Sequence, residues 1–425
     1  MNKPLLIMSA PVATRSGYGD HSRDLLRSLI AMDKYDIKVM SQRWGDCPLN
    51  ALNDKEDQDI ISRLWFGNQL PKQPDIWIQV TVPNEFQPVG KYNIGVTAGI
   101  ETTHISHQWI EGLNRMDLNI VPSVHSRNSI LNSVYDKMDE KTKQKVGELK
   151  CEKPIEVLFE GLDTNVFKKV SDAPLSFVNE MKNIKEEFCF LFVGHWLKGD
   201  YGHDRKDVAG MIKTFCETFK GHKTPKPALI LKSSHATFSV IDREQTINKI
   251  NEIKQMIGGS LPSIYVLHGD MTQEEMNALY NHPKVKAHIS FTHGEGFGRP
   301  LLEASSTQKP VIASNWSGHI DFLKHSVLLP GQLNNVHKSA AWKDVILKES
   351  KWYYVDHAYA KKVLKAVYKK YKKFLPAARI QAKYTRDNFS LDKMTKDFQS
   401  ILESSVPAVP EQVKLTLPKL KKVGV

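Results

Sequence analysis

The chain has 425 residues, of which 41% are hydrophobic and 25% are charged, as in an ordinary folded globular protein. This length exceeds what one hydrophobic core usually organises, so we expect two domains. No apolar run approaches the roughly 18 residues that cross a bilayer. Four cysteines without close spacing argue against a disulfide framework or structural zinc and suit a reducing cytoplasm.

The formal net charge of +12 is concentrated at the C-terminal end. Residues 361–425 carry sixteen Lys and Arg against five Asp and Glu, which leaves about +1 for the rest of the chain. Between Lys361 and Arg386 there are ten basic residues and no acidic one. Such a helix suits an anionic lipid surface or a nucleic acid backbone, and it is equally compatible with a solvated face whose apolar residues contact the protein.

Short apolar runs alternate with helix-length segments, which predicts parallel sheets covered by helices. The expected strands are residues 4–10, 36–40, 75–80, 93–99, 118–123, 155–160, 188–194, 228–232, 264–269, 287–292 and 310–314. The alternation pauses after the sixth strand and then restarts, which indicates two doubly wound domains. We expect domains at 1–168 and 187–345, a linker at 169–186, basic helices at 346–404 and a tail at 405–425.

The stretch "HGEGFGRPLLEAS", residues 293–305, follows one of these strands. Gly294, Gly296 and Gly298 allow backbone N–H groups to approach an anion, and Pro300 is typical of the first turn of a helix. The positive end of that helix favours negative charge. The stretch therefore predicts a diphosphate site.

Two carboxylates flank this predicted diphosphate site. Glu303, one turn into the helix, is suited to accept hydrogen bonds from two neighbouring ribose hydroxyls, and Glu295 in the loop from a second polyol. A ligand that carries a diphosphate between two groups with neighbouring hydroxyls would fit this predicted site, and a nucleotide sugar is such a ligand. The alternative is that both residues have structural roles only, Glu303 near a helix start and Glu295 in a turn, and that neither binds a ligand.

Several segments resemble the retaining glycosyltransferases of family 4, which have the GT-B fold of two facing doubly wound domains around a cleft. The segments are "EGFGRPLLEA", "KPVIASNWSGHIDFL", "DLNIVPSVHSRNSI", "IEVLFEGLDTNVFK" and "FCFLFVGHWLKGDYGHDRKDVAGMIKTF". The sequence of residues 261–305 is also similar to glycosyltransferases encoded by large tailed bacteriophages. The resemblance implies an α/β protein with an acceptor-side first domain and a nucleotide-sugar-binding second domain.

The resemblance also implies roles for residues of the second domain. Glu303 would hold the ribose and Glu295 the transferred sugar. The other donor-binding residues would be Gly294, Gly296, Phe297, Gly298 and Gly318, the amides of residues 296–298 meeting sugar and phosphate. Where the family usually has an arginine, this chain has His195, so Arg205, Lys206 and Lys232 are the candidates for neutralising the departing diphosphate.

The N-terminal "TRSGYGDHSRDLL" places Gly17, Tyr18 and Gly19 at a helix start, and the resemblance implies that this loop faces the donor phosphates. A dinucleotide fingerprint is disfavoured, because an extended loop follows the first strand and the second strand ends without an acidic residue. No G-x-x-x-x-G-K-[ST] phosphate loop occurs.

Glu101 and His104 follow a strand of the first domain and are candidates for orienting or deprotonating an acceptor hydroxyl. A structural role is the alternative for His104. His104 and His107 lack an evident third ligand, and the triplet Asp57–Asp59 lies in a polar run. We therefore expect no metal and no cofactor besides a nucleotide-sugar substrate, UDP-linked by preference.

The acceptor has several candidates. Some phages of the kind named above glycosylate hydroxymethylated cytosine in their own DNA, so we expect a double-stranded or locally opened DNA acceptor in a host cytoplasm, with a flipped base near Tyr18. Lipid-linked and polysaccharide acceptors, the former with peripheral membrane contact, are alternatives. A non-catalytic nucleotide- or nucleic-acid-binding protein is the alternative of another class, and nothing indicates an oligomeric state.

Overall fold

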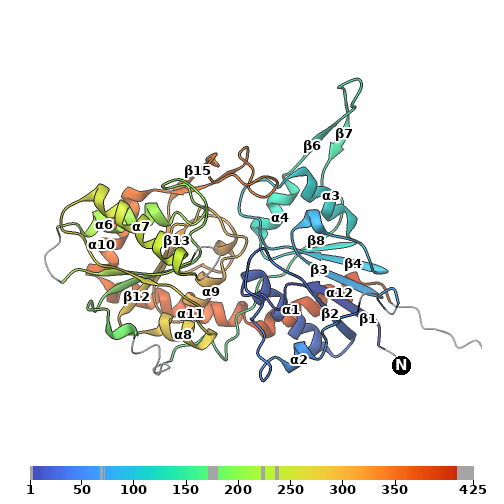
Figure 1. The fold of residues 1–425 in the computed structure, drawn as a ribbon, viewed down its shortest axis with the longest axis horizontal. Helices are drawn as coiled ribbons and strands as arrows, with labels where there is room; N and C mark the ends of the chain where they lie inside the picture. The colour runs from blue at the N-terminus through green and yellow to red at the C-terminus, as the bar shows by residue number, and fades with distance from the viewer. Residues whose placement is uncertain are drawn as a thin grey trace, which may run out of the picture.

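The computed structural model describes residues 3–67, 70, 72–170, 180–221, 225–234 and 239–408 of the chain. Two six-stranded parallel sheets, each covered by helices, form two domains that face one another (Figure 1). The predicted α/β class with two doubly wound domains is confirmed. The expected linker and tail fall partly on residues 171–179 and 409–425, which lie outside the described residues.

The first sheet has the strand order β2-β1-β3-β4-β5-β8. Its strands are β1 (Leu5–Ala10), β2 (Asp36–Ser41), β3 (Ile76–Val80), β4 (Tyr92–Val96), β5 (Leu118–Val121) and β8 (Ile155–Val157). Its helices are α1 (Gly17–Met32), α2 (Gln58–Ile61), the 3-10 helix η1 (Pro83–Glu85), α3 (His107–Arg115) and α4 (Val124–Leu131). The strand order reverses between β1 and β3, and ligands of open parallel sheets bind at the carboxyl ends of such strands.

The second sheet has the strand order β11-β10-β9-β12-β13-β14. Its strands are β9 (Cys189–Val193), β10 (Ala228–Lys232), β11 (Ile264–Leu267), β12 (Val285–Ser290), β13 (Val311–Ser314) and β14 (Val327–Leu329). Its helices are α6 (Val208–Phe219), α7 (Val240–Ile257), α8 (Gln273–Asn281), α9 (Arg299–Ser305) and the 3-10 helix η2 (Gly318–Asp321). The order reverses between β9 and β12, so the loops after these two strands are the expected ligand position.

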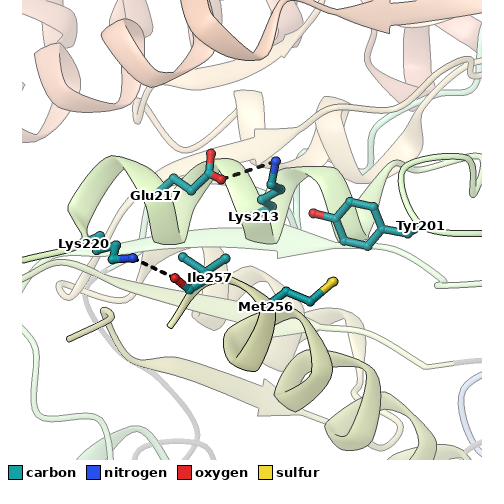
Figure 2. Close-up of a pocket in the computed structure, with 6 residues that line it drawn as sticks. All are labelled: Tyr201, Lys213, Glu217, Lys220, Met256 and Ile257. Atoms are coloured by element: carbon teal, nitrogen blue, oxygen red, sulfur yellow. Dashed lines mark hydrogen bonds and ion pairs between the residues drawn. The ribbon is translucent and has the colours of Figure 1, made fainter. Parts of the chain in front are cut away.

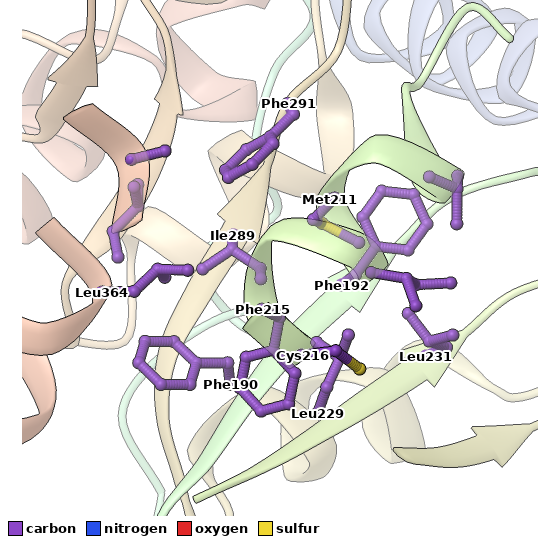
Figure 3. Close-up of a cluster of buried hydrophobic side chains, with 14 of the residues drawn as sticks. Phe190, Phe192, Met211, Phe215, Cys216, Leu229, Leu231, Ile289, Phe291 and Leu364 are labelled. Atoms are coloured by element: carbon purple, nitrogen blue, oxygen red, sulfur yellow. The ribbon is translucent and has the colours of Figure 1, made fainter. Parts of the chain in front are cut away.

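Bulky apolar side chains fill the space between the second sheet and its helices. Figure 3 shows Phe190 and Phe192 of β9 in one cluster with Met211 and Phe215 of α6. Leu191, between the two phenylalanines, belongs to the cluster on the opposite face, as the two-residue period of a strand requires. Truncating one such phenylalanine to alanine typically costs about 3–5 kcal/mol, so this core fixes the strands that carry the loops.

The C-terminal segment joins the two domains. It comprises α10 (His357–Lys369), the 3-10 helix η3 (Tyr371–Phe374), α11 (Leu375–Asn388) and α12 (Leu391–Ser405). Leu364 of α10 lies in the second-domain core, whereas Phe398 of α12 lies in the first-domain core. Where the returning chain meets the outgoing one, the Leu162 amide donates to the Phe389 carbonyl at 2.8 Å. The helices of the range 346–404 therefore pack on both domains.

Two antiparallel hairpins were not expected. One, β6 (Tyr135–Met138) with β7 (Lys145–Leu149), projects from the first domain in Figure 1. The other, β15 (Gly331–Asn335) with β16 (Lys351–Val355), places a strand at the start of the range where basic helices were expected. The strands β6, β7 and β15 are largely polar and lack the apolar run that marks a buried strand.

Candidate functional site at the domain interface

Four charged side chains meet where the domains face each other. Arg205 and Lys206 follow β9, Glu295 follows β12 and Glu101 follows β4, so all four extend from the carboxyl ends of strands. Lys206 Nζ pairs directly with Glu295 Oε1, and Arg205 Nη1 lies 2.8 Å from Glu101 Oε1 and 3.4 Å from Glu295 Oε2. The structure thus brings together two expected phosphate-binding cations, the carboxylate expected to contact the transferred sugar and a candidate base for the acceptor.

Burial and neighbouring charge set the protonation of this group. Burial alone would raise the pKa of Glu295, but Lys206 and Arg205 outweigh burial and lower that pKa to about 2. Burial raises the pKa of Glu101, with Arg205 opposing it. Glu295 is therefore ionised at neutral pH. Phosphate oxygens bind the same cations as carboxylates do, so a phosphate entering here competes with Glu295 and Glu101.

Glu303 projects from the first turns of α9 beside a second interdomain ion pair. Its Oε1 lies 3.3 Å from Arg299 Nε, and its Oε2 accepts a hydrogen bond from the Tyr280 hydroxyl at 3.0 Å. Arg299 also reaches the first domain, where its Nη1 lies 2.6 Å from Asp24 Oδ2. Burial raises the pKa of Glu303 to about 7, with Arg299 opposing it. A carboxylate has about four lone pairs, so acceptor capacity remains for ligand hydroxyls.

The glycine loop before α9 touches the first domain directly. A Cβ atom on Gly296 would lie 1.7 Å from the Ala98 carbonyl oxygen, so the backbones approach too closely for any other residue. Gly298 caps α9 with φ of +100°, a left-handed conformation that favours glycine. Ser123 Oγ donates to the Gly296 carbonyl at 2.6 Å. These glycines therefore serve the contact between domains as well as any approach to an anion.

Further site residues were missed in the sequence. Ser317 Oγ accepts a hydrogen bond from the Glu295 amide at 2.9 Å, and Ser123 caps α4 beside the glycine loop. A serine placed between a predicted strand and a helix was a usable signal for Ser123. No sequence signal joins Arg299 to Asp24, which lie 275 positions apart.

The N-terminal loop lies at the start of α1. A Cβ atom on Gly19 would lie 2.2 Å from the Thr14 carbonyl oxygen, whereas one on Gly17 would have nothing within 4 Å. Arg15 of this loop reaches the second domain, where its Nη1 lies 2.6 Å from Asp270 Oδ2. The loop thus faces the second domain, with Gly19 required by local packing.

The Tyr18 side chain is held by contacts within the first domain. Its ring is buried and stacks on Trp44 with a centroid distance of 3.8 Å. Its hydroxyl accepts hydrogen bonds from both amides of residues 98–99 at 2.9 Å. Tyr18 therefore supports the segment that contacts Gly296, while a flipped base near Tyr18 stays a prediction.

Two expected residues lie outside the contacts of the charged group. Lys232 Nζ donates to the Gly269 carbonyl at 2.6 Å at the end of β10. His104 is exposed, and its Nδ1 lies 2.9 Å from Thr103 Oγ1. Neither side chain is joined by a hydrogen bond or ion pair to the charged group around Arg205 within the described residues.

Three expected donor-loop residues act through the backbone. Phe297 is buried with its ring 5.0 Å from that of Phe322, so its side chain belongs to the core. The Gly318 amide donates to the Glu295 carbonyl at 2.9 Å, and the Gly294 carbonyl accepts from Thr292 Oγ1 at 3.0 Å. These bonds hold the loop in the shape that presents Glu295.

A hollow of about 260 Å³ lies elsewhere, on the face of the second domain between α6 and α7 (Figure 2). It is lined by Tyr201, Lys213, Glu217, Lys220, Met256 and Ile257. Lys213 pairs with Glu217 at 3.3 Å, and this hollow shares no residue with the charged group at the interface.

Two further properties concern the part of the chain that the structure describes. Within it, no three His, Cys, Asp or Glu side chains are grouped so that they could hold a metal ion. None of the described helices is both long enough and apolar enough to span a membrane.

Comparison with known proteins agrees with this architecture. Residues 261–351, which include β12, the glycine loop and α9, match the family described as Glycosyl transferases group 1. No curated protein sequence matches the chain.

Solved structures match over nearly the whole chain at low identity. A glycosyltransferase from Rickettsia africae is 13% identical with a TM-score of 0.63, covering 96% of this chain and 100% of that one. Sucrose-phosphate synthase from Thermosynechococcus elongatus is 12% identical with a TM-score of 0.60, covering 95% and 99%. HepE from Anabaena, solved in complex with UDP and glucose, is 12% identical with a TM-score of 0.59, covering 94% and 100%. The two facing parallel-sheet domains have the GT-B fold of these structures, and the second domain carries the match to glycosyl transferases group 1.

Proposed function

We propose that the protein transfers a sugar from a nucleoside-diphosphate sugar, with a UDP-sugar as the first candidate, to an acceptor hydroxyl with retention of configuration. The observation that carries this proposal is the ion-paired group of Arg205, Lys206 and Glu295, in which Lys206 and Glu295 are buried, with Glu303 on the helix that follows the Glu295 loop. The group 1 match and the similarity to HepE, which was solved with UDP and with UDP-glucose, support the donor class.

The geometry suggests how the donor exchanges with contacts inside the protein. The diphosphate forms ion pairs with Arg205 and Lys206, and in doing so replaces Glu295 and Glu101, which pair with these cations in the structure. Glu295, released from Lys206, then accepts hydroxyls of the transferred sugar, while Glu303 accepts those of the ribose. Since Arg205 and Lys206 supply positive charge at the departing diphosphate, we propose that transfer needs no metal ion.

In the proposed reaction, the acceptor oxygen bonds to the anomeric carbon as the bond from that carbon to the diphosphate oxygen breaks. The bonding electrons leave with the nucleoside diphosphate, and the two cations stabilise that charge. Burial raises the pKa of Glu101, which suits it to take the acceptor proton once Arg205 turns to the phosphates. His104, being exposed, is the weaker candidate for this proton.

A thermal-shift panel of nucleoside diphosphates and nucleotide sugars tests the donor class. A ligand present at about 100 times its dissociation constant stabilises the folded state by about 2.7 kcal/mol. We expect one nucleotide family to raise the unfolding temperature. If none does so for the folded protein, the proposal fails. Release of the nucleoside diphosphate from the stabilising sugar then separates an enzyme from a non-catalytic binding protein.

DNA containing hydroxymethylated cytosine is a candidate acceptor, because α10, η3 and α11 present a concentrated cationic surface. Lys369, Lys370, Lys372 and Lys373 are all exposed. This surface lies at the outer side of the second domain, where α10 packs on α6 (Figure 1). DNA held there would have to extend around the domain to reach Glu295. A peripheral contact with anionic lipid uses the same surface without that requirement.

Salt dependence and product mass test the DNA acceptor. Replacing the four lysines by glutamine should reduce the log–log salt slope of DNA binding by about 3 to 4, since each phosphate contact contributes about 0.9. Replacing Lys137, Lys141 and Lys143 of the β6–β7 hairpin is the matched control. A mass increment on the modified nucleoside supports DNA, and transfer only to a lipid or saccharide excludes it.

A further inference from the structure

A pocket of about 270 Å³ lies between the domains beside the glycine loop. Its first-domain wall is α4 with Thr103, and its second-domain wall is residues 316–321. Ser317 accepts the hydrogen bond of the Glu295 amide, and the ring of Trp316 lies against Gly294. A ligand in this pocket is therefore a neighbour of the loop that presents Glu295.

The pocket combines an aromatic surface with uncharged polar groups. Trp316 supplies an indole ring, and Asn128 and Asn132 supply side-chain amides from α4 and its C-terminus. These two amides have no hydrogen-bond partner within the described residues, although each carries two donors and an acceptor. An apolar ring surrounded by a few unpaired polar groups is the usual make-up of a small-molecule site.

His125 adds a buried polar atom, its Nε2, to the wall of the pocket. Its Nε2 is shielded from solvent and has no hydrogen-bond partner among the described residues, and its ring lies 4.6 Å from that of Trp316. Buried polar atoms are normally paired, so an unpaired one in a pocket wall points to a ligand. Burial lowers the pKa of His125 to about 4, so the ring is neutral at physiological pH.

The charge of the pocket selects the kind of ligand. Among the ten described residues that line it there is no Lys or Arg, and Asp321 contributes a carboxylate whose Oδ2 accepts from the Val124 amide at 2.8 Å. A phosphate-bearing ligand would meet negative charge without a counter-charge. An uncharged ring with several hydroxyls would instead pair with the amides, the carboxylate and the imidazole.

We propose that this pocket binds the acceptor as an uncharged saccharide, its reactive hydroxyl directed toward the Glu295 loop. This inference rests on the proposed transfer reaction and adds the acceptor class and its position. The aromatic ring of Trp316 covers one face of the sugar, and Asn128, Asn132 and His125 bind its hydroxyls. The reactive hydroxyl then lies at the side of the pocket that borders Gly294 and Glu295.

Saturation-transfer NMR tests the pocket with defined probes. Methyl glycosides of glucose, galactose, mannose and N-acetylglucosamine, together with 5-hydroxymethyl-deoxycytidine, are measured with and without UDP. We expect a saturation-transfer signal, and hence binding, for at least one glycoside. Asn128→Ala and Trp316→Leu should each weaken its binding about fivefold or more, as loss of one hydrogen bond or one ring contact with the bound sugar predicts. The exposed Asn251→Ala and Trp342→Leu are matched controls that should leave binding unchanged.

The outcomes separate this inference from the donor assignment. Asn128 is exposed, so its variant should fold even if Trp316→Leu does not. Absence of glycoside binding by the wild type overturns the inference, as does binding that both pocket variants retain or a preference for the modified nucleoside. A thermal shift with UDP on the same samples reports the donor site alone. Its failure contradicts the proposed donor, while the measurements without UDP still decide the pocket.

Discussion

Replacing Glu295 by glutamine perturbs the centre of the charged group while keeping the size of the side chain. In the wild type, the buried carboxylate neutralises Lys206 and shares Arg205 with Glu101. Removing one partner of a buried ion pair typically costs about 3–5 kcal/mol, because the other charge stays buried without compensation. Glu101 still pairs with Arg205, so we expect the lower end of that range.

The assay is urea unfolding of the wild type and Glu295→Gln, with Glu148→Gln as the control. Glu148 pairs with Lys145 at 3.0 Å, but its side chain is 46% exposed, and such pairs contribute at most about 1 kcal/mol. Glu295→Gln should also bind free nucleoside diphosphate at least as tightly as the wild type, since a competing carboxylate is gone, yet transfer sugar poorly. Equal stability of both variants, or loss of nucleotide binding in Glu295→Gln, would contradict the assigned role of Glu295.

Three further predictions follow from particular residues. Nucleotide affinity, measured by calorimetry, should rise with pH through about 7 as Glu303 ionises, and Glu303→Gln should bind more weakly with a flat profile. The raised pKa of Glu303 also means that its folded form holds a proton that the unfolded chain releases, so its contribution to the free energy of unfolding falls from about pH 5 to 7. Gly296→Ala should lower the unfolding temperature by several degrees, whereas Gly17→Ala should leave it unchanged. The reason is that a Cβ atom at residue 296 would clash with the Ala98 carbonyl oxygen, while one at residue 17 would have nothing within 4 Å. Sugar transfer should persist in excess EDTA, and abolition by EDTA with rescue by Mg²⁺ would contradict the metal-free proposal.

Much of the fold was predictable because buried parallel strands are continuous apolar runs. The strand before Glu295 was visible as such an apolar run. The helix after it was visible because Gly298 and Pro300 mark a helix start. The polar hairpin β6–β7 and the return of α12 to the first domain had no such signal. The pairing of Arg299 with Asp24 and the burial of Tyr18 depend on how the domains meet, which local patterns do not encode.

Hydrogen–deuterium exchange, with the nucleotide sugar that gives the largest thermal shift, tests whether the donor binds beside the Glu295–Lys206 pair. It reports where the ligand lies as well as whether it binds. We expect slower exchange in peptides that cover residues 293–303 and 204–206, on both sides of the Glu295–Lys206 pair. Protection confined to the hollow between α6 and α7, around Lys213 and Lys220, would contradict it.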